Sequence, residues 1–239
     1  MKPKIDIPAN KEIIAESFEK IKKEKPEMLE SEFIKKDFSK IVKLFFDEAY
    51  KIYMKYENKV IEDLTQDTLD SIKKDTLTKD EVKTILGKIV NKSIELEKSL
   101  RQSRYARAGS AFEIIVGTLL EQIGIKSEHI TREDKKSGLR PIDLVIPDRK
   151  TAIERPDDAH FLSLKTSLKD RWKLVVEDQT QGQRTHLITL LQGEKLTDEV
   201  AQKIIDRGIF LYIPDEIKDE CFKKNTRVRK LSSLPSKVK

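Results

Sequence analysis

Acidic residues and one lysine recur around two short predicted strands in the second half of the chain. Asp143 lies near the start of the first strand, and Lys165 ends the second strand within the sequence SLK. Three further carboxylates lie on the predicted helices that precede and follow these strands: Glu113, Glu177 and Asp178. Packing of the helices on the strands would gather these carboxylates and the lysine at one end of a small sheet.

Hydrolysis of a phosphodiester bond requires this set of side chains. Carboxylate oxygens bind Mg²⁺, a hard cation, and the bound metal polarises the phosphate and lowers the pKa of a bound water. A lysine orients that water or neutralises the charge that develops in the transition state. The spacing alone is a weak signal, because Asp and Lys are abundant here. The alternative is that Asp143 caps a turn and Lys165 is an ordinary lysine at the end of a strand.

A charged cluster follows the lysine. A helix is predicted over residues 167–179, which places Lys169, Asp170 and Arg171 at its first turn. Lysine and arginine donate to guanine O6 and N7 in the major groove, and a carboxylate accepts from cytosine N4. The cluster therefore has the chemistry to recognise G·C pairs, or it is an exposed charged turn. Trp172 is expected to anchor this helix in the core.

The elements that must position these residues alternate between helix and strand. The segments predicted after residue 100 are a helix over 104–122, strands over 142–146, 161–165, 186–191 and 208–213, and helices over 167–179 and 197–206. Alternation of this kind favours an α/β core with a mixed sheet. We therefore divide the chain into a helical N-terminal region, 1–99, for dimerisation or DNA contacts, and a catalytic and DNA-recognition domain, 100–239.

The N-terminal region has a strong helical periodicity. Thr78 and Glu81 form a predicted capping box at the start of a helix. Two apolar stripes are expected to pack in the core or against a partner helix, in preference to stacking on bases: Val42, Phe45, Phe46, Ala49, Tyr50 and Tyr53; and Val82, Ile85, Leu86, Ile89 and Val90. These stripes make the region the natural candidate for an interface between subunits.

Composition excludes several classes of protein. The chain has 239 residues, 48 Lys+Arg and 42 Asp+Glu, for a net charge of +6. One cysteine excludes a disulfide framework, and no apolar run is long enough for a membrane span. No signal-peptide pattern and no glycine-rich phosphate loop is present, so we expect a cytoplasmic protein without a nucleotide cofactor. Seven basic and no acidic residues follow Cys221; they either contact phosphates or form a solvated, frayed terminus.

Three arginines recur every three residues before the sheet. Arg101, Arg104 and Arg107 share roughly one face of a helix. That face could contact DNA phosphates and set the register of binding without recognising sequence. A solvated basic stripe is the alternative. The three histidines have no metal-ligand spacing and are read as ordinary residues: His129, His160 and His186.

Three segments together resemble a known family. They are RQSRYARAGSAFE (101–113), RPIDLVIP (140–147) and SLKTSLKDRW (163–172). They resemble type II restriction endonucleases of the EcoRII, PspGI and SsoII group, which is related more distantly to NgoMIV. The resemblance covers about residues 100–190, and the third segment is its most specific part. The first 99 residues carry no recognised motif.

The resemblance implies a PD-(D/E)xK nuclease fold, in which helices flank a mixed central sheet, and Mg²⁺-dependent cleavage of double-stranded DNA. It implies recognition sites built on CC and GG, either contiguous (CCGG) or interrupted (CCNGG, CCWGG). Members usually act as homodimers, and some extrude the central base pair of an interrupted site. A two-fold dimer also matches the symmetry of a palindromic site.

The resemblance also implies roles for individual residues. Asp143 corresponds to the central metal carboxylate, although Ile142 departs from the PD spelling, and Lys165 to the catalytic lysine. Glu113 corresponds to a supporting acidic residue, and Gln102 to a glutamine that contacts the outer base pair. The recognition element arginine–acid–arginine corresponds to three residues, with lysine in the first place: Lys169, Asp170 and Arg171.

The last metal carboxylate has two candidates. Glu177 fits by residue type and Asp178 by its spacing from the lysine. Neighbours on a helix point about 100° apart, so only one of them can face the site. Two other functions stay open. One is a sequence-specific DNA-binding module that does not cleave, and the other is a structure-selective repair nuclease whose cutting follows the shape of the DNA.

Overall fold

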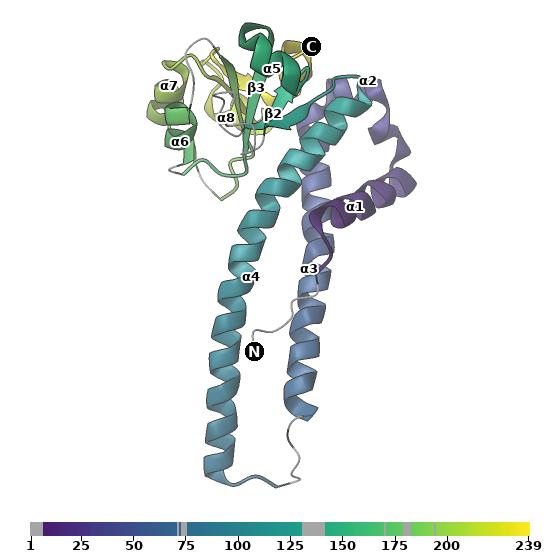
Figure 1. The fold of residues 1–239 in the computed structure, drawn as a ribbon, viewed down its shortest axis with the longest axis vertical. Helices are drawn as coiled ribbons and strands as arrows, with labels where there is room; N and C mark the ends of the chain where they lie inside the picture. The colour runs from purple at the N-terminus through teal and green to yellow at the C-terminus, as the bar shows by residue number, and fades with distance from the viewer. Residues whose placement is uncertain are drawn as a thin grey trace.

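The computed structural model describes residues 7–70, 72, 76–130, 142–169, 171–178, 183–193 and 195–239, with only the backbone of Arg171 and Asp178. A long helical hairpin carries a body of sheet and helices at one end (Figure 1). This arrangement confirms the predicted N-terminal helical region and α/β core.

The helical region contains α1 (Asn10–Glu24), the 3₁₀ turn η1 (Pro26–Leu29), α2 (Ser31–Lys36), α3 (Phe38–Asp70) and α4 (Lys79–Gln122). The predicted capping box begins α4: the Glu81 amide donates to Thr78 Oγ1 at 3.3 Å, and the Thr78 amide donates to Glu81 Oε2 at 2.9 Å. The helix then runs for 44 residues without a break. The helix predicted over 104–122 is its last part, so α4 crosses the proposed boundary at residue 99.

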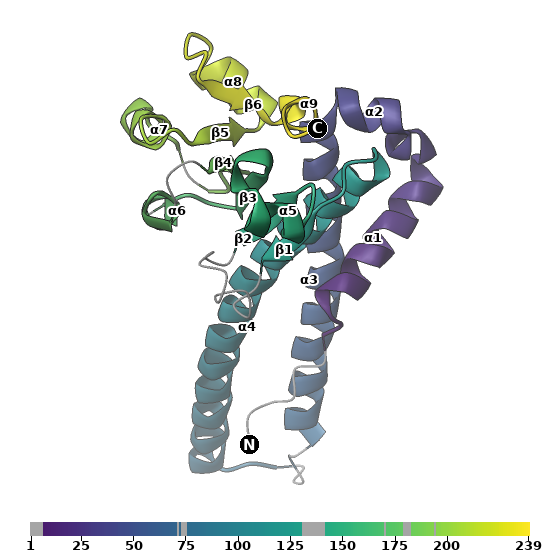
Figure 2. The same ribbon diagram turned by 45° about the horizontal axis from the view of Figure 1, so that its top comes forward.

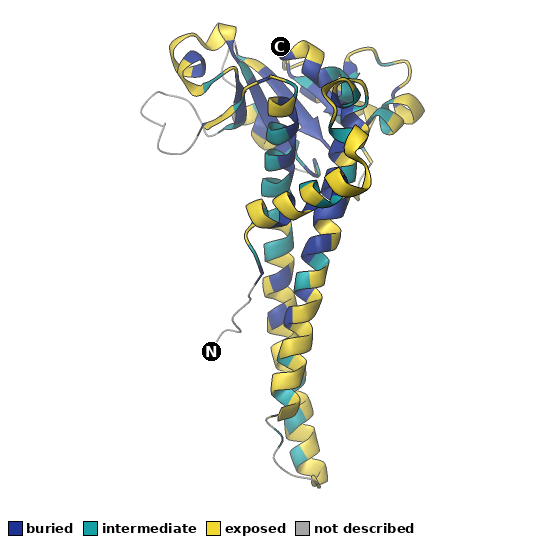
Figure 3. Ribbon diagram, turned by 90° about the vertical axis from the view of Figure 1, so that its right-hand side faces the viewer, coloured by how far each residue is buried: buried dark blue, intermediate teal, exposed yellow. Residues whose placement is uncertain are grey.

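Helices α1, α3 and α4 share one core near the body. Phe18 stacks on Phe45, with ring centroids 4.0 Å apart, and the Phe46 ring meets the Phe112 ring edge-on. These aromatic pairs fix α3 against α1 and α4, as the first apolar stripe predicts. For Tyr50 of that stripe the prediction of a core position is wrong, because its side chain is 52% exposed. The far half of the hairpin is mostly exposed (Figure 3), and there Leu86 and Val90 are 55% and 54% exposed.

In the described part of the chain, the sheet is mixed and has six strands in sequence order. They are β1 (Glu128–Ile130), β2 (Ile142–Ile146), β3 (His160–Lys165), β4 (Arg184–Thr189), β5 (Phe210–Ile213) and β6 (Val228–Lys230). The pairs β1–β2 and β2–β3 are antiparallel, and the remaining pairs are parallel. Between the parallel strands lie α6 (Arg171–Asp178), α7 (Asp198–Ile205) and α8 (Asp215–Cys221); α5 (Arg149–Glu154) and η3 (Pro156–Asp158) follow β2.

Alternating side chains of the sheet pack on opposite layers. Leu162, Leu164 and Ile188 belong to the core shared with α3 and α4. Leu187 and Leu211 belong to the core under α6 and α7. Figure 2 shows the helices on the two sides of the sheet. The strand period of two residues therefore places α4 across the strands that carry the predicted chemistry.

The C-terminal segment is part of the fold. After β6, η4 (Leu231–Ser233) and α9 (Leu234–Lys237) place Leu231, Leu234 and Val238 in the main core with no exposed surface. Asp215 accepts hydrogen bonds from the amide and hydroxyl of Ser232. The alternative of a solvated, frayed terminus is therefore wrong, because the apolar residues among the basic ones are buried.

The helix predicted from residue 167 begins later than expected. Leu168 is 3% exposed and packs in the core under α6 and α7. Lys169 has φ +31°, outside the helical region, and α6 extends from Arg171 to Asp178. Burial of Leu168 therefore draws residues 166–169 into a turn. Trp172 packs against the same core, as predicted.

Within the described residues, every helix is too short or too polar to span a membrane.

Candidate active site

Asp143 and Lys165 meet across neighbouring strands. Lys165 Nζ lies 2.7 Å from Asp143 Oδ2, and the two side chains are 23% and 22% exposed. The Leu164 amide also donates to Asp143 Oδ2, at 2.6 Å, and the Ser163 hydroxyl lies 3.4 Å from it. The antiparallel pairing of β2 with β3 brings the start of one strand to the end of the other. The carboxylate is thus held by two strong donors in a partly solvated position.

Glu113 joins this pair from α4. Burial raises the pKa of its carboxyl to about 7; the negative charge of Asp143 acts in the same direction, and Lys165 opposes it. The helix brings Glu113 to the pair because its neighbours Phe112 and Val116 are fully buried in the core that α4 shares with the sheet. The structure therefore brings together three of the predicted residues: Glu113, Asp143 and Lys165.

The donor set fits a divalent cation. The negative charge of Asp143 helps to keep Glu113 protonated, and a cation bound beside Glu113 would favour its ionised form. Carboxylate oxygens are the ligands that Mg²⁺ prefers. Among the residues that the structure describes, no three acidic, histidine or cysteine side chains are grouped closely enough to hold a metal. Glu177 is exposed on α6, and the side chain of Asp178 lies outside the described part. The choice between these two stays a prediction.

The charged cluster of Lys169, Asp170 and Arg171, called the recognition cluster below, is only partly described. Lys169 is exposed in the turn before α6. Asp170 lies outside the described residues, and Arg171 is described by its backbone alone. Lys169 lies four residues after Lys165, so the turn that carries it starts at the candidate active site.

A cleft of about 770 Å³ lies between the helical region and the body. Its walls come from α1, α3, α4 and the loops that follow β3 and β4. Lys169, Gln192 and Arg101 line it together with two exposed aromatic residues, Tyr50 and Tyr105. Basic and aromatic side chains in one cleft match the charge and the stacking surfaces of nucleic acid.

Two of the three predicted phosphate contacts are held by other elements of the chain. Arg104 Nε donates to both carboxylate oxygens of Glu57 at 3.0 Å, and the Glu57 side chain is 1% exposed. Arg107 donates to the backbone carbonyls of Ile7 and Pro8, at 3.2 and 2.6 Å. These arginines join α3 and the N-terminal segment to α4.

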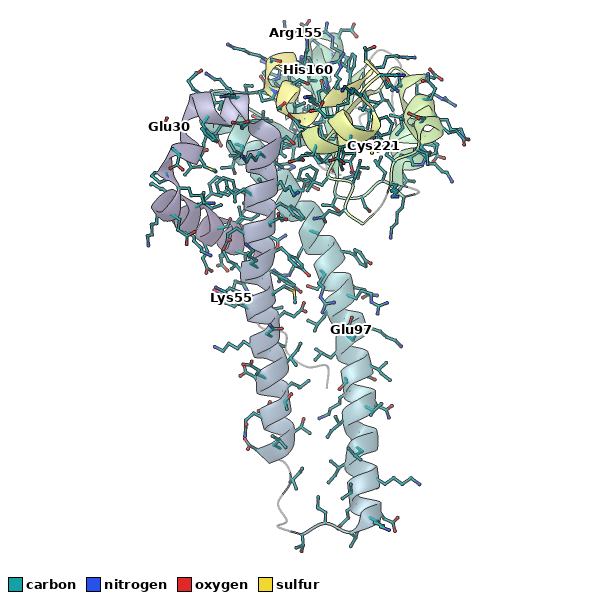
Figure 4. The ribbon with its side chains drawn as sticks, turned by 180° about the vertical axis from the view of Figure 1, so that it is seen from behind. Glu30, Lys55, Glu97, Arg155, His160 and Cys221 are labelled. Carbon is teal, nitrogen blue, oxygen red and sulfur yellow. The ribbon has the colours of Figure 1, made fainter. Side chains whose placement is uncertain are left out.

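Arg101 differs from the other two arginines. Its side chain is 64% exposed and lies 3.8 Å from Glu97, which projects from the same helix (Figure 4). Gln102 is also exposed on α4. Arg101 lines the cleft and can reach a ligand there, whereas Gln102 is not among the residues that line it. Gln192 and Tyr105 also line the cleft, although the sequence analysis assigned neither of them a role.

Two of the three histidines, His160 and His186, form part of a polar chain across the sheet, whereas His129 is exposed on β1. His160 Nδ1 lies 2.9 Å from His186 Nε2, and His186 Nδ1 lies 3.3 Å from the Tyr212 hydroxyl. Arg229 donates to that hydroxyl at 3.0 Å. Burial lowers the pKa of His186 to about 3, helped by the charges of His160 and Arg229. The neutral side chain joins the strands, which agrees with the prediction of ordinary histidines.

A family model described as EcoRII C terminal matches residues 70–234. The chain belongs to this family. One relative is the type II restriction enzyme EcoRII of Escherichia coli, 25% identical over 134 residues, which are 54% of this chain and 31% of that protein. Another is the type II restriction enzyme SsoII of Shigella sonnei, 28% identical over 142 residues, which are 56% of this chain and 46% of that protein. The chain thus matches less than half the length of these relatives.

Solved structures show the same fold as this member of the EcoRII C-terminal family. A complex of the restriction endonuclease PspGI with substrate DNA matches with a TM-score of 0.71 at 23% identity, covering 100% of this chain and 94% of that chain. Metal-depleted Ecl18kI in complex with uncleaved, modified DNA matches with a TM-score of 0.80 at 19% identity, covering 97% and 78%. These matches include the N-terminal helices, which the family model does not reach before residue 70.

Proposed function

We propose that this member of the EcoRII C-terminal family is a Mg²⁺-dependent endonuclease. It would hydrolyse phosphodiester bonds of double-stranded DNA at a short palindromic site with a CC/GG core. One observation carries the proposal: Lys165 Nζ and Asp143 Oδ2 are 2.7 Å apart on adjacent strands, with the carboxyl of Glu113 beside them. A protein that only binds DNA has no need of this arrangement.

The chemistry divides between the metal and the chain. Asp143, Glu113 and one of Glu177 or Asp178 would hold Mg²⁺, which when bound polarises the phosphate and lowers the pKa of a water. The Leu164 amide fixes the orientation of the Asp143 carboxylate. Lys165 places its ammonium beside that carboxylate, where it neutralises charge that develops on the phosphate oxygens.

The cleft would receive the DNA. Lys169, Asp170 and Arg171 would contact the G·C pairs, and Gln102 the outer pair, through donors and acceptors that match the base edges. Arg101 would contact phosphates. The other two arginines of the stripe would serve the fold instead. Release of Arg104 would leave Glu57 buried and uncompensated, and release of Arg107 would free the carbonyls of Ile7 and Pro8. The two structural neighbours are themselves complexes with DNA.

A homodimer suits a palindromic site, because its two-fold axis coincides with that of the DNA. We assign the interface to the helical region. Four exposed aliphatic residues form a row along α4, one turn apart: Val82, Leu86, Val90 and Ile94. A cytoplasmic location follows from the proposed substrate. Light scattering that shows a monomer with and without DNA would count against the dimer.

The first test is digestion of a long, sequenced DNA with Mg²⁺ or with EDTA, followed by sequencing of the fragment ends. Discrete Mg²⁺-dependent ends that share a CC/GG core are expected. DNA binding without cleavage would favour the binding module. Cuts that follow DNA shape and lack a common sequence would favour the repair nuclease.

A further inference from the structure

We propose that Gln192 recognises an A·T pair of the site from the same edge of the cleft as Lys169. The inference rests on the proposed function and adds a specificity-determining residue to it. It starts from the loops that follow two neighbouring parallel strands, and from the way each loop presents one polar side chain to the cleft.

The two loops are joined by their backbones. Strands β3 and β4 are parallel and paired from His160–Arg184 to Lys165–Thr189, so both chains leave the sheet at the same edge. Beyond that edge the Gln192 amide donates to the Thr166 carbonyl at 2.9 Å. The loop after β4 is therefore attached to the loop that carries the recognition cluster, and the two should approach DNA as one surface.

The loops also repeat one arrangement. In each, a buried leucine precedes an exposed polar residue: Leu168 before Lys169, and Leu191 before Gln192. The two leucines are 3% and 5% exposed and pack in the same core under α6 and α7. Each loop has a non-glycine residue at positive φ, +31° at Lys169 and +52° at Leu191. The buried leucines thus fix two polar side chains that line one cleft.

The side-chain chemistry of Gln192 indicates its target. A carboxamide presents one acceptor and a donor side by side, which match N6 and N7 of adenine in the major groove, whereas lysine matches O6 and N7 of guanine. The Gln192 side chain makes no hydrogen bond with any other residue that the structure describes. The side-chain carboxamide of Gln192 is therefore available to a base beside the G·C pair that Lys169 would contact.

The test measures sequence discrimination. Wild type, Gln192→Ala and the matched control Gln202→Ala cleave a DNA library randomised across the site and its flanks, and cleaved and uncleaved molecules are sequenced. Gln202 is also an exposed glutamine between β4 and β5, but it lies on α7, away from the cleft, and its side-chain amide donates to Asp206 at the end of that helix. Thermal unfolding checks that both variants fold.

We expect Gln192→Ala to lose about 5- to 150-fold discrimination at an A·T position of each half-site, the range for one bidentate base contact. Preferences at the G·C positions and the profile of Gln202→Ala should match wild type. An unchanged profile for Gln192→Ala would overturn the inference and leave the endonuclease intact. So would a uniform loss at all sequences, because that indicates a phosphate contact. Failure of wild type to cut at discrete sites would overturn the proposed function as well.

Discussion

Glu113 offers a quantitative test of the candidate metal site, because folding disfavours the ionised form of its carboxyl group. Folding raises its pKa from 4.5 to about 7, through burial and the charge of Asp143. Between these two pH values the folded protein holds a proton that the unfolded chain has released, so stability falls as the pH rises. A change of this size corresponds to at most about 3 kcal/mol, and partial solvent contact reduces it to about 1–2 kcal/mol.

The substitution Glu113→Gln removes the ionisable group and keeps the shape. In EDTA, wild type and variant should have similar free energies of unfolding near pH 4. The variant should become more stable by about 1–2 kcal/mol as the pH rises to 8. Urea unfolding followed by circular dichroism measures the difference at each pH. Glu121→Gln is the control, since Glu121 is exposed on the same helix.

Magnesium should reverse the order of stability of wild type and Glu113→Gln at pH 8. A metal that binds only the folded state stabilises it by RT ln(1 + [L]/Kd), and ionised Glu113 is one of its proposed ligands. Wild type should therefore gain more stability from Mg²⁺ at pH 8 than at pH 6, and Glu113→Gln should gain less than wild type. Parallel pH curves in EDTA would refute the assigned pKa, and equal Mg²⁺ stabilisation of both proteins would refute the metal role.

Three further predictions test the other parts of the site. Lys165→Ala and Asp143→Ala should each lower single-turnover cleavage at least about 100-fold without loss of helical circular dichroism, and undiminished cleavage by both would refute the mechanism. Lys169→Ala should lose about 1–3 kcal/mol of discrimination at one G·C position, measured by competitive cleavage of substituted sites. Arg104→Ala should destabilise the fold by about 3–5 kcal/mol in urea, because it leaves a buried glutamate unpaired. Arg101→Ala should leave stability unchanged and reduce the salt dependence of DNA binding by about one phosphate contact.

The meeting of Asp143 and Lys165 at one end of the sheet could be predicted from sequence, because local patterns indicate the two strands that carry them. The apolar run 142–146 and the segment 161–165 each indicate a buried strand, and neighbouring strands bring their ends together. These two predicted strands are enough to place Asp143 near Lys165. The donation from the Leu164 amide to Asp143 could not be foreseen, because it depends on the exact antiparallel register.

Partners distant in sequence account for the arginines. The spacing of Arg104 and Arg107 predicted that they share one face of a helix, but it did not predict which segments pack against that face. Glu57 lies 47 residues before Arg104, and the carbonyls of Ile7 and Pro8 about 100 residues before Arg107. Charge periodicity cannot separate a solvated or DNA-contacting stripe from one that anchors other elements. The same limit explains the C-terminal segment, whose buried leucines appear from sequence as isolated residues in a basic tail.

The turn at Lys169 shows how burial overrides helix signals and what this does for the proposed enzyme. Burial of Leu168 makes the chain turn tightly after β3. Lys169 therefore lies on a short loop that begins at Lys165 and is anchored by Leu168. The backbone bond from Gln192 to Thr166 fixes the same loop from the side. Base contacts made there would position the scissile phosphate beside Lys165 through this short connection. Misplacement of reacting groups by about 1 Å can cost about 100-fold in rate. A wrong base pair would therefore lower cleavage more than binding.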